Sequence, residues 1–175
     1  MDLSFLCNVD ELCSFYDDLG DDTFRVGYLV ALSESFAVFN LVSTRGFENG
    51  LYFTSVDNIY QVSVNDKYTN RIKRLFKIQN QSKTELEFNG ENPLFDEFLQ
   101  YSQKNEQLIT IETDNGTLIS GKIKAFDCNV VNINAIDEDG IEDGEIYIET
   151  DCIVKMWCNT DRERNIQELY RAENI

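Results

Sequence analysis

Carboxylates are the most densely placed reactive side chains in this sequence. Five of them lie within the eight residues from Asp137 to Gly144. A calcium-binding loop needs oxygen ligands at alternate positions and a closing glutamate about twelve residues along. Ile141 occupies the third of those alternate positions, so the spacing does not match such a loop. The pattern favours a solvated acidic hairpin and leaves cation binding by this turn open.

Groups for nucleophilic or acid–base catalysis are few. The sequence has no histidine, which excludes a zinc site of the Cys/His type. It also has no glycine-rich phosphate loop. Its five cysteines form no CxxC pair and indicate reduced thiols. Cys128 follows Asp127 in a predicted turn, where acidic neighbours would raise the pKa of its thiol and weaken it as a nucleophile. We expect no enzyme, no catalytic residue, no metal and no cofactor, with an unrecognised hydrolase as a minor alternative.

Basic side chains gather in one stretch. Six of the fifteen lie between Lys67 and Lys83, and Lys67, Arg71 and Arg74 share one face of a predicted helix. Such a face could bind phosphate or an acidic partner. The alternative, which we favour, is a solvated face that lies against the acidic second half of the chain.

The whole chain is acidic, with 32 carboxylates, 15 lysines and arginines and a net charge of −17. This charge repels nucleic acid and anionic membranes and favours a basic protein as partner. No apolar run approaches the roughly 20 residues of a membrane span. Because the N-terminus also lacks the basic start of a secretion signal, we expect a cytoplasmic protein.

The elements that carry these residues are repeated. Residues 27–75 align without a gap with residues 121–169, with eleven identities over 49 positions; an unrelated pair would match at roughly one position in fifteen. The identical pairs are Gly27/Gly121, Ala31/Ala125, Asn40/Asn134, Gly46/Gly140, Glu48/Glu142, Gly50/Gly144, Asp57/Asp151, Ile59/Ile153, Asn65/Asn159, Ile72/Ile166 and Leu75/Leu169. We predict a first module at residues 1–78, a linker at 79–92 and a second module at 93–175.

Short runs of β-branched and aromatic residues predict strands, and a 3.6-residue period predicts the helices. The predicted strands are 24–31, 36–42, 51–56, 59–64, 108–112, 117–126, 130–136, 145–150 and 152–158, and the helices are 66–78, 93–103 and one opened by the capping box Thr160–Glu163. The N-terminal segment is either a helix capped by Asn8 or a strand near residues 13–17, followed by a turn at 18–22. The fold class is therefore mainly β with α (α+β), with two repeated five-stranded small barrels, each followed by a helix.

Four glycines and two aspartates mark equivalent turns of the two modules. Glycine admits the positive φ angles that tight turns require. We expect each aspartate to accept backbone N–H bonds where the fourth strand bends into the fifth. The structural turn residues are Gly46, Gly50, Asp57, Gly140, Gly144 and Asp151.

The second module resembles the first motif of Sm-like small barrels. The resemblance lies in Leu108-Ile109-Thr110-Ile111, in Gly116 and in the run from Gly121 to Asp127, and it covers about fifty residues in this module and, more weakly, fifty in the other. It implies tandem Sm-like/SH3-like barrels, and the twin glycine repeat is similar to a group of uncharacterised proteins of Gram-positive bacteria. No activity comes with that group.

The RNA contacts of the Sm family do not carry over to these residues. Val131 stands where the family has an asparagine, and Lys155-Met156 and Gln61-Val62 stand where it has an Arg-Gly pair. We therefore expect no nucleic-acid partner.

One face of the first module is unusually apolar. Strand alternation places its side chains on one side of the sheet, where copy two has Ser120, Lys122, Lys124 and Asn132. The predicted interaction face consists of Phe24, Val26, Tyr28, Val30, Phe36 and Val38. We expect the N-terminal segment or the 94–101 helix to cover it, with a homodimer as the alternative.

Together these patterns predict a non-enzymatic cytoplasmic protein-interaction module. Its alternatives are an acidic immunity or neutralising protein for a basic toxin or nuclease, and a divergent RNA-binding Sm-like protein.

Overall fold

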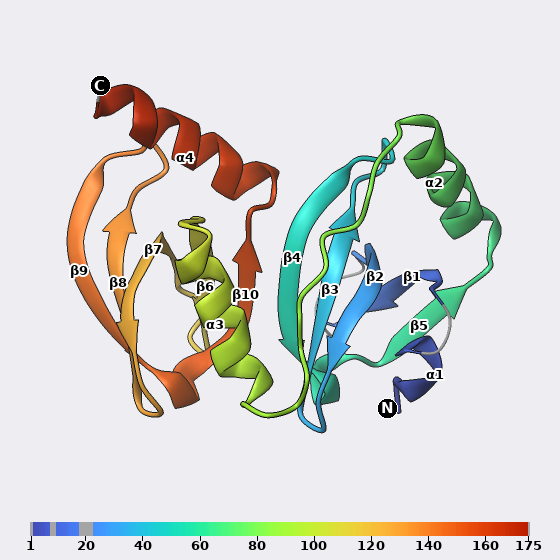
Figure 1. Cartoon of the computed structure of the whole chain (residues 1–175), viewed down its shortest axis with the longest axis horizontal. Helices are drawn as coiled ribbons and strands as arrows, with labels where there is room; N and C mark the ends of the chain where they lie inside the picture. The colour runs from blue at the N-terminus through green and yellow to red at the C-terminus, as the bar shows by residue number, and fades with distance from the viewer. Residues whose placement is uncertain (1, 8–9, 18–22, 175) are drawn as a thin grey trace. The chain divides into compact units, whose positions relative to one another are not determined.

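The computed structural model describes residues 2–7, 10–17 and 23–174. It has two compact units, Met1–Leu94 and Phe95–Ile175, and is mainly β with α-helices (Figure 1). Asn8 and the turn predicted at residues 18–22 lie outside the described residues.

The first unit contains five antiparallel strands in the order β5-β1-β2-β3-β4. Its elements are α1 (Ser4–Cys7), β1 (Leu12–Tyr16), β2 (Arg25–Leu32), β3 (Phe36–Val42), β4 (Glu48–Ser55), the 3₁₀ turn η1 (Val56–Asn58), β5 (Gln61–Val64) and α2 (Lys67–Ile78). The N-terminal segment thus forms a strand, and β1 lies between β2 and β5.

Aromatic and aliphatic side chains fill both faces of this sheet. On one face, Phe15 stacks on Phe39 with ring centroids 3.9 Å apart, and Tyr52 lies next to them. On the other face, apolar residues of β1, β2 and β3 pack against α2. That second cluster consists of Leu12, Val26, Tyr28, Val42, Ile72 and Phe76. Burial of each large side chain contributes about 1.5–3 kcal/mol, so α2 is an integral layer of the unit.

Residues 79–92, which we call the strap, continue from α2 along β3 and β4 (Figure 1). The Gln81 side chain accepts the backbone N–H of Glu48 at 3.1 Å, and Asn40 Oδ1 accepts the backbone N–H of Thr84 at 2.8 Å. Leu86 is buried. The segment predicted as a linker is therefore part of the first unit.

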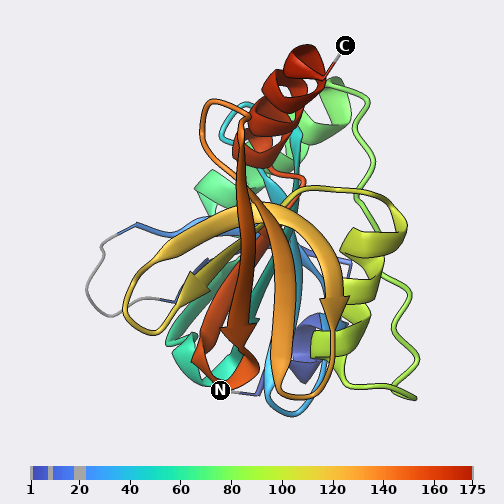
Figure 2. The same ribbon diagram turned by 90° about the vertical axis from the view of Figure 1, so that its left-hand side faces the viewer.

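The second unit repeats this order of elements, with its strands arranged β10-β6-β7-β8-β9. Its elements are α3 (Leu94–Lys104), β6 (Ile109–Thr113), β7 (Leu118–Phe126), β8 (Val130–Ile136), β9 (Glu142–Glu149), η2 (Thr150–Cys152), β10 (Ile153–Cys158) and α4 (Asp161–Glu173). The bounds of β8, β9 and η2 lie 94 residues after those of β3, β4 and η1. Figure 2 shows the curved strands β7 to β9 with α4 across one end of them.

The predicted capping box opens α4 and ties it to the sheet. Glu163 accepts the backbone N–H of Thr160 at 3.0 Å and the hydroxyl of Thr110 on β6 at 2.6 Å. Ile166 of this helix packs with Leu108 and Ile136. Because Glu163 is buried, these bonds are needed to satisfy its carboxylate.

Candidate functional site

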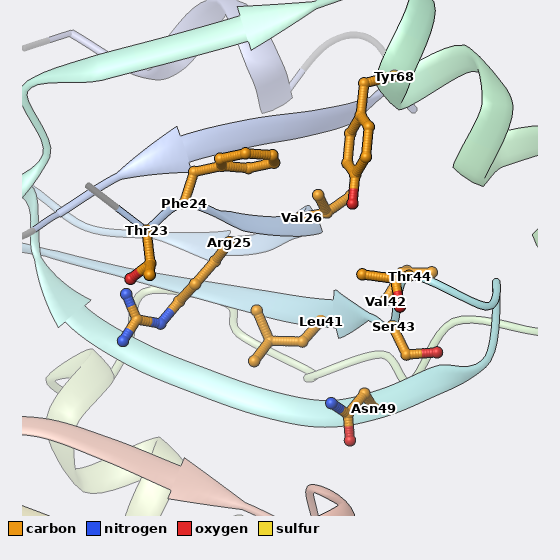
Figure 3. A pocket seen from close by; sticks show the side chains of 10 residues that line it. All are labelled: Thr23, Phe24, Arg25, Val26, Leu41, Val42, Ser43, Thr44, Asn49 and Tyr68. Carbon is orange, nitrogen blue, oxygen red and sulfur yellow. The ribbon is translucent and has the colours of Figure 1, made fainter. Parts of the chain in front are cut away.

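A pocket of about 450 Å³ opens beside β2 and β3 of the first unit. Figure 3 shows the rings of Phe24 and Tyr68 on one side and Leu41, Ser43 and Asn49 on the other. The two rings meet edge to face, with centroids 5.2 Å apart. Among the described residues that line this pocket there is no carboxylate or thiol. The described walls suit a small apolar group with a polar end.

Arg25, which also lines the pocket, is held in place from inside the unit. Its guanidinium forms an ion pair with Asp17 and lies 4.6 Å from the centroid of the Tyr52 ring. The Tyr52 hydroxyl donates to the other oxygen of Asp17. Burial raises the pKa of Tyr52 well above its ordinary value, so it remains a neutral donor. This group could not be predicted from the sequence, because its members come from different strands and no local pattern joins them.

The predicted interaction face is not an exposed surface. Tyr28 is 7% exposed and Val38 is fully buried, while Val30 and Phe36 are half-buried. Only Phe24, at 38%, is exposed, at the mouth of the pocket. Tyr28 and Val38 therefore offer no exposed surface in this structure.

The cover comes mainly from an element that we had not expected. The ring of Phe76 on α2 lies 5.6 Å from that of Tyr28, so the module's own helix packs on this face. A bulge between Leu29 and Ala31 also breaks the alternation on which the six-residue face was predicted. Leu12, from the N-terminal segment that was one of the two predicted covers, packs in the same buried cluster as Tyr28 and Phe76.

The predicted basic face lies on α2 as expected. Lys67, Arg71 and Arg74 are all exposed, and none has an ion-pair partner in the part of the chain that the structure describes. Lys73 pairs instead with Glu11 at 2.7 Å, and Lys83 of the strap with Asp10 at 2.7 Å. Three free cations on one helix could meet an anionic group.

In the second unit, the equivalent outer face is polar and open. Tyr147 on β9 is 68% exposed, and Glu145 beside it pairs with Lys124. The acidic turn that joins β8 and β9 is exposed at its carboxylates, and Asp137 accepts the backbone N–H groups of Asp139 and Ile141 at 3.0 and 2.8 Å. These bonds give the turn a local structure of its own.

The predicted turn glycines have matching conformations. Gly46 and Gly140 have φ values of +80°, and Gly50 and Gly144 have φ values of +73° and +81°. Each first glycine packs on the helix that follows its unit's strands, where an added Cβ would lie less than 3 Å from Leu75 or from Tyr170.

The role predicted for Asp57 and Asp151 is not seen. Both lie in the 3₁₀ turns between the fourth and fifth strands of each unit, and both are exposed. Within the described residues neither carboxylate accepts the expected backbone bonds. In the first unit, the Ser55 hydroxyl instead accepts the backbone N–H of Asp57 at 3.2 Å, because the serine precedes the turn and can cap it.

The described residues show neither a metal-binding cluster nor a membrane-spanning helix. Across residues 2–7, 10–17 and 23–174 there is no group of three or more Cys, Asp or Glu side chains placed to hold a metal ion. No helix in that same part of the chain is long and apolar enough to cross a bilayer.

Comparison with known proteins adds no relative. No protein-family model matches the sequence, and a search of curated proteins finds no match.

Proposed function

We propose that this chain is a non-enzymatic, cytoplasmic protein-interaction protein whose second unit binds a basic partner. The observation that carries the proposal is the distribution of charge. Residues 95–175 have 18 carboxylates and 7 basic side chains, which gives a net charge of −11. Residues 1–94 have 14 carboxylates and 8 basic side chains, which gives a net charge of −6. A surface so charged attracts cationic partners and repels nucleic acid.

We further propose that each unit is a small barrel of the Sm-like/SH3-like kind. The strand orders support this, because β5 lies beside β1 and β10 beside β6, so that the last strand returns to the first. A 3₁₀ turn precedes that return in both units. The fold alone implies no activity.

A more specific form of the proposal is a neutralising protein that covers the basic surface of a toxin or nuclease. Glu138, Asp139 and Asp143 support this form, because their exposed carboxylates lie at or next to the acidic turn. Only Glu138 of these has an ion pair, with Arg162 at 3.0 Å, in the described part of the chain.

The proposal is tested by affinity capture from a lysate of the source organism, with and without nuclease treatment. We expect one basic protein to be retained at about 50 mM salt and released at about 500 mM, because screening shortens the range of surface charges. Retention of nucleic acid would instead support the Sm-like RNA-binding alternative. Turnover of a substrate by the purified chain would contradict a non-enzymatic role.

A further inference from the structure

In the first unit, the side-chain amide of Asn40 and the carboxylate of Glu48 bind the strap, and we call these two the receiving groups. Asn40 Nδ2 donates to the Glu48 carboxylate and to the Gly50 carbonyl, both at 2.8 Å, and Asn40 Oδ1 accepts the backbone N–H of Thr84 at 2.8 Å. The Thr84 hydroxyl donates to the same Glu48 oxygen at 3.0 Å. A single hydroxyl residue of an extended segment thus satisfies both receiving groups.

The second unit repeats the receiving residues. Asn134, Glu142 and Gly144 lie 94 positions after Asn40, Glu48 and Gly50. The register of β8 and β9 shifts just after Asn134, as that of β3 and β4 shifts just after Asn40. The backbone that shapes the receiving site is therefore present in both units.

In the second unit the receiving groups have no such segment on them within the described residues. The Asn134 side chain makes no hydrogen bond there, and Glu142 accepts from the Tyr170 hydroxyl at 2.8 Å. A Cβ added to Gly144 would meet no atom within 4 Å. Asn132 Oδ1, two residues before Asn134 on the same strand, is buried and has no hydrogen-bond partner in the part of the chain that the structure describes. The first unit shows what such groups bind when a segment is present.

The surroundings of the two receiving sites differ in polarity. Leu51 and Phe53, each 1% exposed, lie beside the strap's site, and their counterparts are the exposed Glu145 and Tyr147. A segment that fits the second site therefore meets a wetter face, on which Lys122 lies opposite Asn134 and Lys124 pairs with Glu145, in a unit whose net charge is −11. Lysine or arginine flanking the hydroxyl residue suits this face.

We propose that the outer face of β8 and β9 is a docking surface for an extended, basic segment of a partner protein. The backbone N–H and the hydroxyl of one Thr or Ser residue bind Asn134 and Glu142, as Thr84 binds Asn40 and Glu48. The inference rests on the proposed function and names its contact surface. A second copy of this chain is a poor occupant, because it carries −17 and its strap is held in its own first unit.

The test uses a synthetic peptide of residues 79–88 that carries Glu85→Lys and Glu87→Lys. It keeps the Thr84 hydroxyl and becomes basic. Titrated into the ¹⁵N-labelled full chain, it should shift the NMR signals of the Asn134 side-chain amide and the Gly144 backbone amide, and leave those of Asn40 and Gly50 unchanged.

Matched variants separate the docking contacts from general charge. Asn134→Ala and Glu142→Gln should each weaken peptide binding by roughly fivefold or more, the loss expected for one hydrogen bond to an exposed face. Glu149→Gln removes one charge from the far end of the same strand and should change affinity by less than about twofold. The same basic peptide with Thr84→Val added should bind to the wild-type chain as weakly as the basic peptide that keeps Thr84 binds to the Glu142→Gln chain.

Several outcomes would overturn the inference. One is that about 1 mM peptide leaves the NMR signal of the Asn134 side-chain amide unshifted, and another is that Glu149→Gln weakens peptide binding as much as Glu142→Gln does. Peptide-induced shifts confined to Asn40, or self-association of the free chain through β9, would also overturn it. The proposed function fails separately. A basic partner recovered from lysate that leaves the Asn134 amide unshifted refutes this docking mode and leaves the function standing, whereas specific peptide binding with no partner in lysate supports the docking mode and contradicts the function.

Discussion

Gly46 and Gly140 each hold a turn against a helix. Their positive φ is one constraint, and the lack of space is a second, because a Cβ on Gly140 would lie 2.4 Å from the backbone nitrogen of Tyr170. Gly144, near the start of β9, has a φ of +81° and open space. The two glycines therefore separate backbone strain from steric overlap.

Gly140→Ala should lower the free energy of unfolding by about 2–4 kcal/mol, because backbone strain and overlap with α4 add. Gly144→Ala, the matched control, should cost about 1 kcal/mol from backbone strain alone. Urea unfolding followed by circular dichroism measures both. If both variants lose the same free energy of unfolding, steric overlap between the β8–β9 turn and α4 does not contribute.

Two cysteines should differ sharply in reactivity. Burial raises the pKa of Cys13 to about 12, and its thiol donates to the Gly27 carbonyl at 3.4 Å. At pH 8 only about one in ten thousand of these thiols is ionised. Cys128 is exposed at the turn between β7 and β8.

Iodoacetamide at pH 8 should therefore label Cys128 in the native chain and leave Cys13 unmodified, as measured by peptide mass spectrometry. In urea both should be labelled. Labelling of Cys13 at the rate of Cys128 in the folded chain would mean that β1 opens readily.

At the scale of elements, the strap is the clearest difference between the units. Asn40 is fully buried and makes three hydrogen bonds, whereas Asn134 makes none with its side chain among the described residues. We expect Asn40→Ala to cost about 2–4 kcal/mol, because it leaves the Thr84 N–H and the Gly50 carbonyl without the bonds that Asn40 supplies and removes one of the hydrogen bonds to Glu48. Asn134→Ala should stay within about 0.5 kcal/mol.

Urea unfolding compares these two variants, and hydrogen exchange of the Thr84 amide reports on the strap directly. This amide should be protected in the wild-type chain and in Asn134→Ala, and should exchange quickly in Asn40→Ala. Rapid exchange in the wild-type chain would mean that the strap is not docked.

Much of the element pattern could be predicted from the sequence. The predicted strands 36–42 and 130–136 coincide with β3 and β8, and the capping box at Thr160 opens α4. The N-terminal segment could not be decided, because β1 is buried on both faces and so loses the alternation that marks a half-buried strand. The strap could not be predicted because Thr84 finds its partner 44 residues away.

The candidate sites were harder to predict than the elements. Exposed cations on α2 follow directly from helical spacing, and Lys67, Arg71 and Arg74 do share an exposed face. The apolar face containing Tyr28 was expected to be covered, but the sequence does not say which helix packs on it. The identities Asn40/Asn134 and Glu48/Glu142 were the signal for the receiving site, but identity alone does not show what these side chains bind.

For the whole molecule, the two units combine similar strand orders with different surfaces. In the first, α2 and the strap cover the sheet face, and the exposed charges on the helix are basic. In the second, the matching face carries Glu142, Glu145 and Tyr147 in the open. We propose that a basic protein binds this second face.

Site-specific photo-crosslinking tests that claim most directly. A photoreactive phenylalanine analogue would replace Tyr147 in one chain and Tyr60, which is 41% exposed in the first unit, in a control chain. In lysate at about 50 mM salt we expect Tyr147 to yield one crosslinked basic protein, lost at about 500 mM, and Tyr60 to yield none. Crosslinks from Tyr60 alone, or a crosslink from Tyr147 that is indifferent to salt, would contradict the account.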